Sequence, residues 1–515
     1  MRCNLRTLPG AASLAALLIL AGAVQAQDKA KADNVSVEPP SAVLPTFEYQ
    51  VPDTRVMKPL DDQVRIVFIN RSQNPKEWDA LAAFWNPVTE QATDSRTGKT
   101  YARKLVKIKV PLGLTQSPAV PPENPMTLSR WALGKKLYFD PILSSDRTVS
   151  CASCHDPRKG YTDQSPVSTG IHGNKGGVSA PTVVNAAYSP LQFWDGRAAS
   201  LEEQAQGPPT NPLEMFDGSP GDAWEQAVKR IKAMPEYVQM FKEAYGTEPT
   251  RDAAAKAIAT YERTVLSGNS IHDRADLAMR RRVDEEESGK FEIQAKDYEV
   301  VLKDAFSRKD LSALKALQLD PEKDVARVGE IARKLNSGRQ VFFGKARCNS
   351  CHVGDNFTDN QFHNLGVGVK DGRLPKDALG RFARLPLGHK DPDLIGAFKT
   401  PTLRGLLGTG PYMHDGSEAT LAKVVEFYDD GGRANEFLDV KMRDYDAEQA
   451  YRDSQKAGTP SKGPEVKLFG KDQKPIVPLH LKLTPEEKDN LVQFMRALEG
   501  DPIDPMVAQP DRMPE

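Results

Sequence analysis

Two five-residue units in this chain have the residue types that bind an iron-containing cofactor. Residues 151–155 are Cys-Ala-Ser-Cys-His, and residues 348–352 are Cys-Asn-Ser-Cys-His. Paired cysteines also form disulfides or zinc sites, but neither explains a histidine directly after the second cysteine. Covalent haem does, because each thiol adds to one vinyl group and the adjacent histidine reaches the iron. The units predict two haem c groups: the first on Cys151, Cys154 and His155, the second on Cys348, Cys351 and His352.

The N-terminus predicts export. Arg2 and Arg6 give a positive start, residues 11–24 form a short apolar run, and small residues precede a cleavage site after Ala26. Haem c is attached outside the cytoplasm, so the signal peptide and the haem units agree on a periplasmic location. An uncleaved membrane anchor is the alternative. No second apolar run of about 18 residues follows, so we expect no membrane span after cleavage.

The composition fits a globular protein. The chain has 515 residues, with 69 Lys and Arg against 70 Asp and Glu. This balance leaves no basic excess for a phosphate backbone, so nucleic acid is not an expected partner. The length predicts roughly two to four domains.

The chain around the haem units repeats itself. Residues 133–139, LGKKLYF, precede the first unit, and residues 337–343, SGRQVFF, precede the second. Downstream, Asp195 follows a Pro-Thr pair at 181–182, and Asp415 follows another at 401–402, with the same spacing. We interpret the two halves as copies of one mostly helical haem-binding module.

The halves differ directly after this repeat, where we expect functional differences. In the first half, prolines end a helix and leave Gln204 and Glu214 in or beside a loop, where solvated residues are the alternative. In the second half, Thr420 can cap a helix with one apolar face that ends near Gly431. Tyr428 lies on that face and points toward the core or a haem, and an ordinary core tyrosine is the alternative.

The chain divides into five predicted segments. These are a signal peptide (1–26), an N-terminal extension (27–120), a first haem domain (121–275), a charged helical insert (276–330) and a second haem domain (331–505). In the extension we expect strands over 64–70 and 103–112 and a helix over 75–85. The prediction is therefore a mainly α protein with a small N-terminal extension of α/β character.

Five stretches together resemble the bacterial dihaem cytochrome c peroxidase family and its MauG-like branch. They are FDPILSSDRTVSCASCH (139–155), GIHGNKGGVSAPTVVNA (170–186), FWDGRAASLEEQAQGPPTNPLEM (193–215), AFKTPTLRG (397–405) and GPYMHDGSEATL (410–421). The resemblance covers roughly residues 120–505, without the insert. It implies two cytochrome c-like helical haem domains packed around an inter-haem interface. One haem would react with hydrogen peroxide, and the other would pass electrons.

The resemblance implies four further residues at the first haem. Gln204 and Glu214 match the pair beside bound peroxide, where a carboxylate can move a proton from the near oxygen to the leaving one. Trp194 matches a tryptophan between the haems, with a core aromatic as the alternative. His172 matches the loop histidine that caps the peroxidatic iron in resting peroxidases, with a surface loop histidine as the alternative.

At the second haem, the position opposite His352 separates the branches. The typical peroxidase has a methionine there, and this chain matches the MauG-like branch with Tyr428. A phenolate favours oxidised iron, whereas a thioether favours the reduced state. Met413 is the rival ligand and ranks lower because it aligns with Phe193 in the repeat. His414 is expected near a propionate, without binding iron.

The resemblance also implies a calcium ion between the domains. Thr409 and Pro411 match its carbonyl donors. Ser179 stands where the usual asparagine would be, which weakens the site.

Three functions are compatible with these residues. The first is a periplasmic peroxidase that reduces hydrogen peroxide to water with electrons from a small c-type cytochrome or cupredoxin. The second is a MauG-like enzyme that uses peroxide to oxidise a partner protein or organic substrate through a high-valent iron state, and Tyr428 favours it. The third is an electron carrier with both irons capped, against which Gln204 and Glu214 argue. The sequence leaves a homodimer open.

Overall fold

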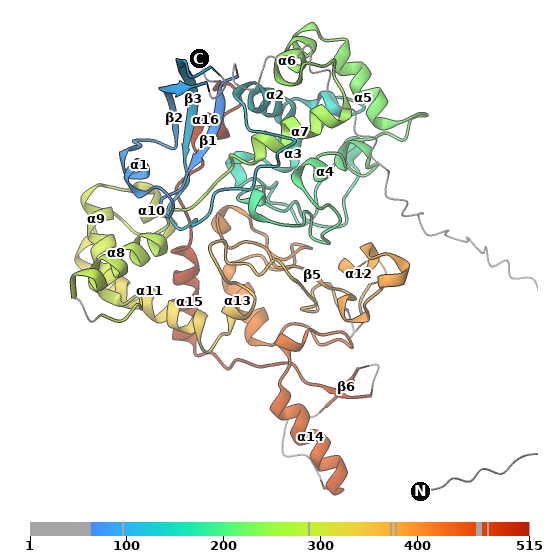
Figure 1. Cartoon of the computed structure of the whole chain (residues 1–515). Coiled ribbons are helices and arrows are strands. Elements are labelled where there is room, and N and C mark those ends of the chain that lie inside the picture. The colour runs from blue at the N-terminus through green and yellow to red at the C-terminus, as the bar shows by residue number, and fades with distance from the viewer. Residues whose placement is uncertain are drawn as a thin grey trace, which may run out of the picture. The chain divides into compact units, whose positions relative to one another are not determined.

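Helices build most of the computed structural model, which describes residues 63–94, 97–286, 289–370, 373–375, 378–459, 466–470 and 473–513. These residues belong to one unit, Gln50–Glu515 (Figure 1). The expected signal peptide, 1–26, and residues 27–62 of the extension lie outside the described residues. Among the helices of the described ranges, none combines the length and apolarity needed to cross a bilayer.

The N-terminal extension contains a three-stranded sheet. Its elements are β1 (Arg65–Ile69), α1 (Pro75–Ala80), β2 (Trp85–Thr93) and β3 (Thr100–Lys109). β3 lies in the middle, parallel to β1 and antiparallel to β2. The strands expected over 64–70 and 103–112 correspond to β1 and β3. The expected helix is shorter, because Leu81 takes an extended backbone and Trp85 begins β2, where its ring packs 4.7 Å from Trp131.

The first haem unit lies in a helical half of the chain. Its helices are α2 (Leu128–Phe139), α3 (Cys151–Cys154), α4 (Leu201–Gln204), α5 (Ala223–Lys232), α6 (Pro235–Tyr245) and α7 (Arg251–Glu262). α2 packs on α7 through buried aromatic side chains that include Trp131, Tyr138 and Tyr261. Gly134 permits this approach, because a Cβ atom there would lie 1.8 Å from the carbonyl oxygen of Ala257.

The second half repeats this helix pair. Its elements are α11 (Val328–Phe343), β4 (Phe362–His363), α12 (Arg381–Arg384), β5 (Phe398–Lys399), α13 (Leu421–Asp429), α14 (Tyr445–Ala457), β6 (Leu468–Phe469), β7 (Pro475–Ile476) and α15 (Pro485–Arg496). α11 packs on α15, and a Cβ atom at Gly338 would lie 1.9 Å from the carbonyl oxygen of Asn490. Gly134 and Gly338 occupy equivalent places in the two repeated segments, and both bring a helix into backbone contact with its partner.

The backbone repeats in the downstream segments as well. Phe193 and Met413 have the same φ of 68°, in the left-handed region. Ser200 and Thr420 then cap α4 and α13, each by accepting a hydrogen bond from the backbone three residues later. The two halves therefore share a local fold up to these caps. They diverge beyond them, because α4 ends at Gln204 whereas α13 continues to Asp429.

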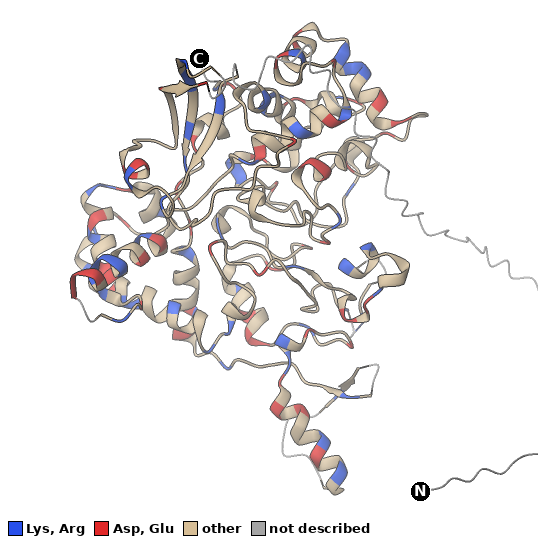
Figure 2. Cartoon of the chain, viewed as in Figure 1, with Lys and Arg blue, Asp and Glu red and all other residues tan. Residues whose placement is uncertain are grey.

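The charged insert forms a helical layer beside α11. Its helices are α8 (Ile271–Glu286), α9 (Ala295–Ser307) and α10 (Leu311–Ala316). Tyr298 and Leu302 of α9 are buried in one cluster with Leu335 of α11. Acidic and basic residues are mixed along α8 and α9 (Figure 2).

The C-terminal segment returns to the first half. α16 (Pro505–Ala508) places Val507 in the core of that half, where its carbonyl accepts a hydrogen bond from the Tyr261 hydroxyl at 3.0 Å. The buried Lys135 amine donates to the carbonyl of Met506 at 2.6 Å. The first half therefore includes residues from both ends of the described chain.

Arg404 and Asp273 form a buried ion pair between the second half and α8. The two terminal guanidinium nitrogens lie 2.7 and 2.9 Å from the carboxylate oxygens, and the side chains are 1% and 5% exposed. Removing one partner of such a pair leaves a buried charge unpaired, at a cost of about 3–5 kcal/mol. We expect Asp273→Asn to lower the free energy of unfolding by about 3 kcal/mol in a denaturant titration of the haem-loaded protein.

The control for this prediction is Asp276→Asn on the same helix. Asp276 pairs with Arg280 at 2.7 Å, but the Arg280 and Asp276 side chains are 57% and 38% exposed. Exposed pairs contribute at most about 1 kcal/mol. Equal losses for the two variants would contradict the structural role of the Arg404–Asp273 pair.

Candidate active site

The histidines of both haem units are oriented by a backbone carbonyl. His155 Nδ1 lies 3.3 Å from the Tyr161 carbonyl oxygen, and His352 Nδ1 lies 2.8 Å from that of Phe357. A carbonyl only accepts, so Nδ1 carries the hydrogen and Nε2 keeps a lone pair for a metal ion. Burial lowers the pKa of both histidines, which favours the neutral, ligating form.

The cysteines next to these histidines are available for covalent attachment. All four thiols are free and half-buried. Burial raises the pKa of the Cys154 thiol to about 11 and that of Cys348 to about 12. Each unit therefore presents two thiols beside an oriented imidazole, and this set of groups fits a covalently bound haem.

A cavity of about 280 Å³ extends from the second haem unit. Cys348, Cys351 and His352 line it, and Tyr428 of α13 lines it as well. Thr420 caps α13 as expected, and its hydroxyl accepts a hydrogen bond from the Lys423 amide at 3.2 Å. Burial raises the pKa of Tyr428, so its phenolate would require the compensating charge of a metal ion.

Met413 and His414 line the same cavity. The His414 ring stacks on Phe398 with centroids 3.5 Å apart and meets Trp194 edge-on at 6.3 Å. Burial lowers the pKa of His414 to about 4, so its imidazole is neutral. His414 is therefore held in an aromatic cluster, while Met413 and Tyr428 both remain within the cavity.

Trp194 comes from the first half but lines this cavity of the second half. Its indole Nε1 donates to the Ser179 carbonyl at 2.9 Å, and its own carbonyl accepts from the Lys399 amide at 2.8 Å. Ser179 in turn donates its amide hydrogen to the His414 carbonyl at 2.7 Å. The tryptophan therefore lies where the two halves meet.

Gln204 and Glu214 lie on the first-half side. Gln204 is the last residue of α4 and is half-buried. Burial raises the pKa of Glu214, although Arg197 and a 2.6 Å hydrogen bond from the Asn211 amide oppose this shift. The Glu214 charge also contributes to raising the pKa of Cys151, which places this carboxylate near the first haem unit.

Comparisons with known proteins identify the family of this chain. A family model described as di-haem cytochrome c peroxidase matches residues 129–281. The methylamine utilization protein MauG of Methylorubrum extorquens is 32% identical over 361 residues, which are 69% of this chain and 84% of that protein. The chain belongs to the dihaem cytochrome c peroxidase family, in its MauG-like branch. The cytochrome c551 peroxidase of Nitrosomonas europaea is also 33% identical, over 60% of this chain and 74% of that protein.

A solved structure shares the fold of this dihaem peroxidase. The crystal structure of a MauG-like protein associated with microbial copper homeostasis superposes with a TM-score of 0.52 and 24% identity, over 77% of this chain and 97% of that one. Family membership makes the chain an oxidoreductase with peroxide as electron acceptor and two haem c groups.

The loop of His172 is tied to Glu214 in this dihaem peroxidase. The Ile171 amide donates to the Glu214 carbonyl at 2.9 Å. A Cβ atom at Gly170 would lie 2.1 Å from the Leu213 carbonyl oxygen, so the loop packs directly on this segment. The His172 side chain itself is exposed, with a left-handed backbone of φ 56°.

The three residues expected at a calcium site belong to the lining of the same cavity. Ser179, Thr409 and Pro411 all line it. The Ser179 hydroxyl donates to the Met413 carbonyl at 3.3 Å. Calcium binding stays a prediction.

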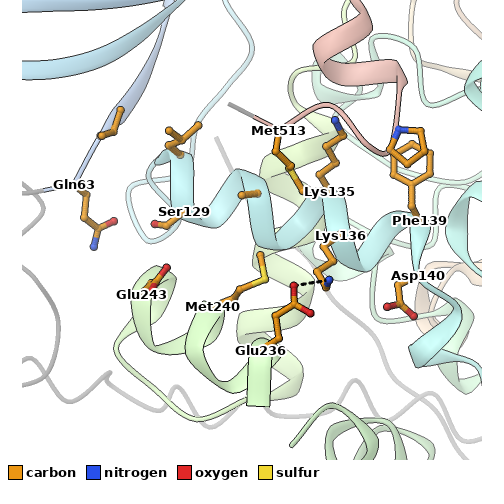
Figure 3. A pocket seen from close by; sticks show the side chains of 14 residues that line it. Gln63, Ser129, Lys135, Lys136, Phe139, Asp140, Glu236, Met240, Glu243 and Met513 are labelled. Carbon is orange, nitrogen blue, oxygen red and sulfur yellow. Dashed lines mark hydrogen bonds and ion pairs between the residues drawn. The ribbon is translucent and has the colours of Figure 1, made fainter. Parts of the chain in front are cut away.

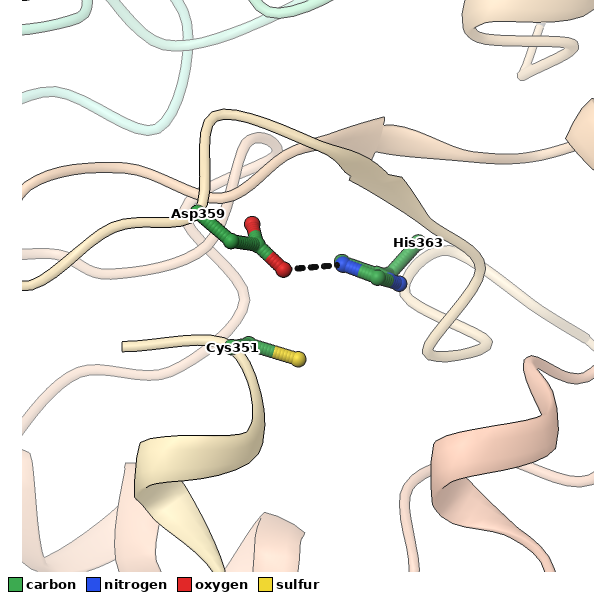
Figure 4. A group of neighbouring side chains, drawn as sticks. All are labelled: Cys351, Asp359 and His363. Carbon is green, nitrogen blue, oxygen red and sulfur yellow. Dashed lines mark hydrogen bonds and ion pairs between the residues drawn. The ribbon is translucent and has the colours of Figure 1, made fainter. Parts of the chain in front are cut away.

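A charged cluster beside Cys351 was not predicted from the sequence (Figure 4). His363 Nε2 lies 2.9 Å from Asp359, and its Nδ1 lies 2.7 Å from Asp439. Burial lowers the pKa of His363, but these hydrogen bonds to carboxylates outweigh that effect and raise the pKa to about 10. Cys351, Asp359 and His363 are close enough to hold a metal ion. Haem attachment uses the Cys351 sulfur, however, so we assign no metal there.

A larger cavity, of about 780 Å³, lies between α2 and α6 (Figure 3). Lys136 and Glu236 form an ion pair across it at 2.8 Å, and Met513 lies at its edge. It contains none of the predicted site residues, so size alone does not identify the site of this dihaem peroxidase.

Proposed function

We propose that this protein is a periplasmic dihaem c-type peroxidase that reduces hydrogen peroxide to water with electrons from a small redox protein. The observation that carries the proposal is Glu214, a half-buried carboxylate with a raised pKa near the cysteines of the first haem unit. The half-buried Gln204 at the end of α4 supplies a second polar group on the first-half side. An electron carrier with both irons capped would have no use for such a base.

Proton movement is the contribution of the chain itself. The first haem, when bound, supplies the iron that binds peroxide and accepts electrons for its reduction. Glu214 takes the proton from the near peroxide oxygen and returns it to the far one, which leaves as water. Two electrons and two further protons complete the reduction to a second water. The Gln204 amide donates a hydrogen bond that orients the bound peroxide.

The second haem and Trp194 provide the electron route in this proposal. Two cytochrome c-like domains, residues 121–275 and 331–505, would pack around the inter-haem interface that contains Trp194. The insert, 276–330, supports the second domain through α11. The extension, 27–120, follows a cleaved signal peptide, 1–26, and provides further surface for a partner.

A second function is favoured by one observation, the position of Tyr428. Its side chain lines the same cavity as His352, and a phenolate ligand would favour the oxidised state of the second haem. In that case the enzyme would use peroxide to oxidise a partner protein or organic substrate. The relative MauG is a methylamine utilization protein.

A donor-dependent assay of the haem-loaded protein separates these functions. We expect peroxide-dependent oxidation of a reduced small cytochrome c or cupredoxin, followed by its absorbance. Oxidation of an organic donor with no oxidation of either redox protein would favour the MauG-like function. No peroxide consumption with any donor would contradict both.

A further inference from the structure

Lys399 contacts both ends of the first-half segment 189–194, which carries Trp194. Lys399 lies on β5 of the second half. Its Nζ donates to the Ser189 hydroxyl and to the Leu191 carbonyl, both at 2.6 Å. Its backbone amide donates to the Trp194 carbonyl at 2.8 Å. One residue therefore fixes the segment 189–194 against the second half.

Placing this amine at the contact between the two halves costs free energy, which makes it a poor choice if its role is only to join them. Both acceptors of its hydrogen bonds are neutral, and among the described residues no carboxylate pairs with it. Burial lowers the pKa of Lys399 to about 8. Lys399 is half-buried and lines the cavity of the second haem unit, and an amine taken out of water needs hydrogen bonds in place of its hydration. An apolar side chain would join the two halves at a lower cost in free energy. The two hydrogen bonds that the amine donates in fixed directions therefore explain its presence better than simple contact between the halves does.

Two further contacts of Trp194 involve Ser179 of the first half and His414 of the second half. Its indole nitrogen donates to Ser179 of the first half. Its ring meets His414, which stacks on Phe398, the neighbour of Lys399 on β5. β5 therefore contacts Trp194 directly through the Lys399 backbone and reaches its ring through His414. The Lys399 side chain sets where β5 lies along the first half.

We propose that Lys399 is a positioning residue that holds Trp194 in the path between the two haems. The proposal rests on the proposed role of Trp194 in electron transfer. Replacing Lys399 by Met removes both side-chain hydrogen bonds and keeps the backbone one. The segment 189–194 then loses its first anchor, and Trp194 can shift relative to the second half.

The test measures two rates in the haem-loaded protein: electron transfer between the haems after rapid reduction of the second haem, and the reaction of the first haem with peroxide. We expect Lys399→Met to slow the transfer by about tenfold, since displacements near 1 Å have effects of this size or larger. The reaction with peroxide should stay at the wild-type rate. Ser189→Ala removes one acceptor and should slow the transfer in the same direction.

Lys390→Met is the matched control. Its Nζ also donates to backbone carbonyls, those of Phe382 at 2.7 Å and Ala383 at 3.3 Å, but all of these lie within the second half. We expect wild-type transfer in this variant. If Lys390→Met slows the transfer as much as Lys399→Met, the effect is general loosening and the proposal is overturned.

Trp194→Phe separates this proposal from the proposed function. If Trp194→Phe slows the transfer and Lys399→Met does not, the role of Lys399 is overturned while the function stands. If neither variant slows it, Trp194 is not on the electron route, and Lys399 has no route to position. If Lys399→Met fails to load both haems, Ser189→Ala decides between these outcomes.

Discussion

Replacing Glu214 by Gln should slow the reaction with peroxide by about 10²–10⁴-fold, the usual contribution of a general acid–base group. The amide keeps the shape of the side chain but cannot accept the peroxide proton. The hydrogen bond from Asn211 at 2.6 Å can still be made to the remaining oxygen. Stopped-flow absorbance gives the rate, and the haem absorbance per chain verifies that both haems are attached.

The pH dependence of this rate gives a second readout. Burial raises the pKa of Glu214 above its ordinary value of 4.5. A base works only when it is deprotonated, so the wild-type rate should fall as the pH decreases through this raised pKa. Glu214→Gln should lose that decrease.

Glu203→Gln is the control for Glu214→Gln. The Glu203 carboxylate lies on α4 beside Gln204 and accepts a hydrogen bond from the Ala199 amide at 2.7 Å. We expect wild-type rates and an unchanged pH dependence. Wild-type kinetics in Glu214→Gln itself would remove this carboxylate from the mechanism.

Replacing Tyr428 by Met should raise the reduction potential of the second haem by on the order of 100 mV or more, because axial ligands set haem potentials over a range of about 0.8 V. The phenolate stabilises oxidised iron, whereas a thioether stabilises the reduced state. Tyr428→Phe should instead remove the ligand and change the low-spin spectrum of one haem. Spectroelectrochemistry and EPR of the two variants provide the measurements.

Tyr412→Phe is the matched control, because Tyr412 lines the same cavity and its hydroxyl donates to the Leu406 carbonyl at 3.4 Å. We expect the potential and the spectrum of this variant to match those of the wild type. If Tyr428→Phe also leaves the spectrum unchanged, Tyr428 is a core residue and Met413 becomes the candidate ligand.

The local elements near the haem units could be predicted because short-range rules determine them. The helix after Thr420 follows from its cap, its apolar spacing and the glycines that end it, and α13 spans Leu421–Asp429 with Gly431 and Gly432 beyond it. The internal repeat was visible as residue spacing. It reappears as equal backbone angles at Phe193 and Met413.

Long-range contacts could not be predicted in the same way. β2 carries few apolar residues, and its strand begins where Trp85 packs on a distant tryptophan and pairs with Ile108 of β3. The cluster of Asp359, His363 and Asp439 joins His363 to a carboxylate 76 residues further along the chain. Asp359 and His363 are four residues apart, which is also the spacing of two residues on one face of a helix. Their spacing alone is therefore only a weak indication of a charged cluster.

The exposed side chain of His172 bears on how the enzyme is activated. Its loop follows the Glu214 segment closely, while the ring faces solvent. On this placement we expect a resting enzyme whose first haem is open to peroxide, and capping of that iron by His172 stays the alternative prediction.

The reaction of the fully oxidised protein with one equivalent of peroxide tests the account most directly. The measurement is an absorbance and EPR spectrum before and after mixing, with no reductant present. The account predicts that the first-haem signal changes within the mixing time, and that Glu214→Gln delays this change. A spectrum that stays unchanged until one electron is supplied would contradict an open first haem, and would mean that His172 caps its iron at rest.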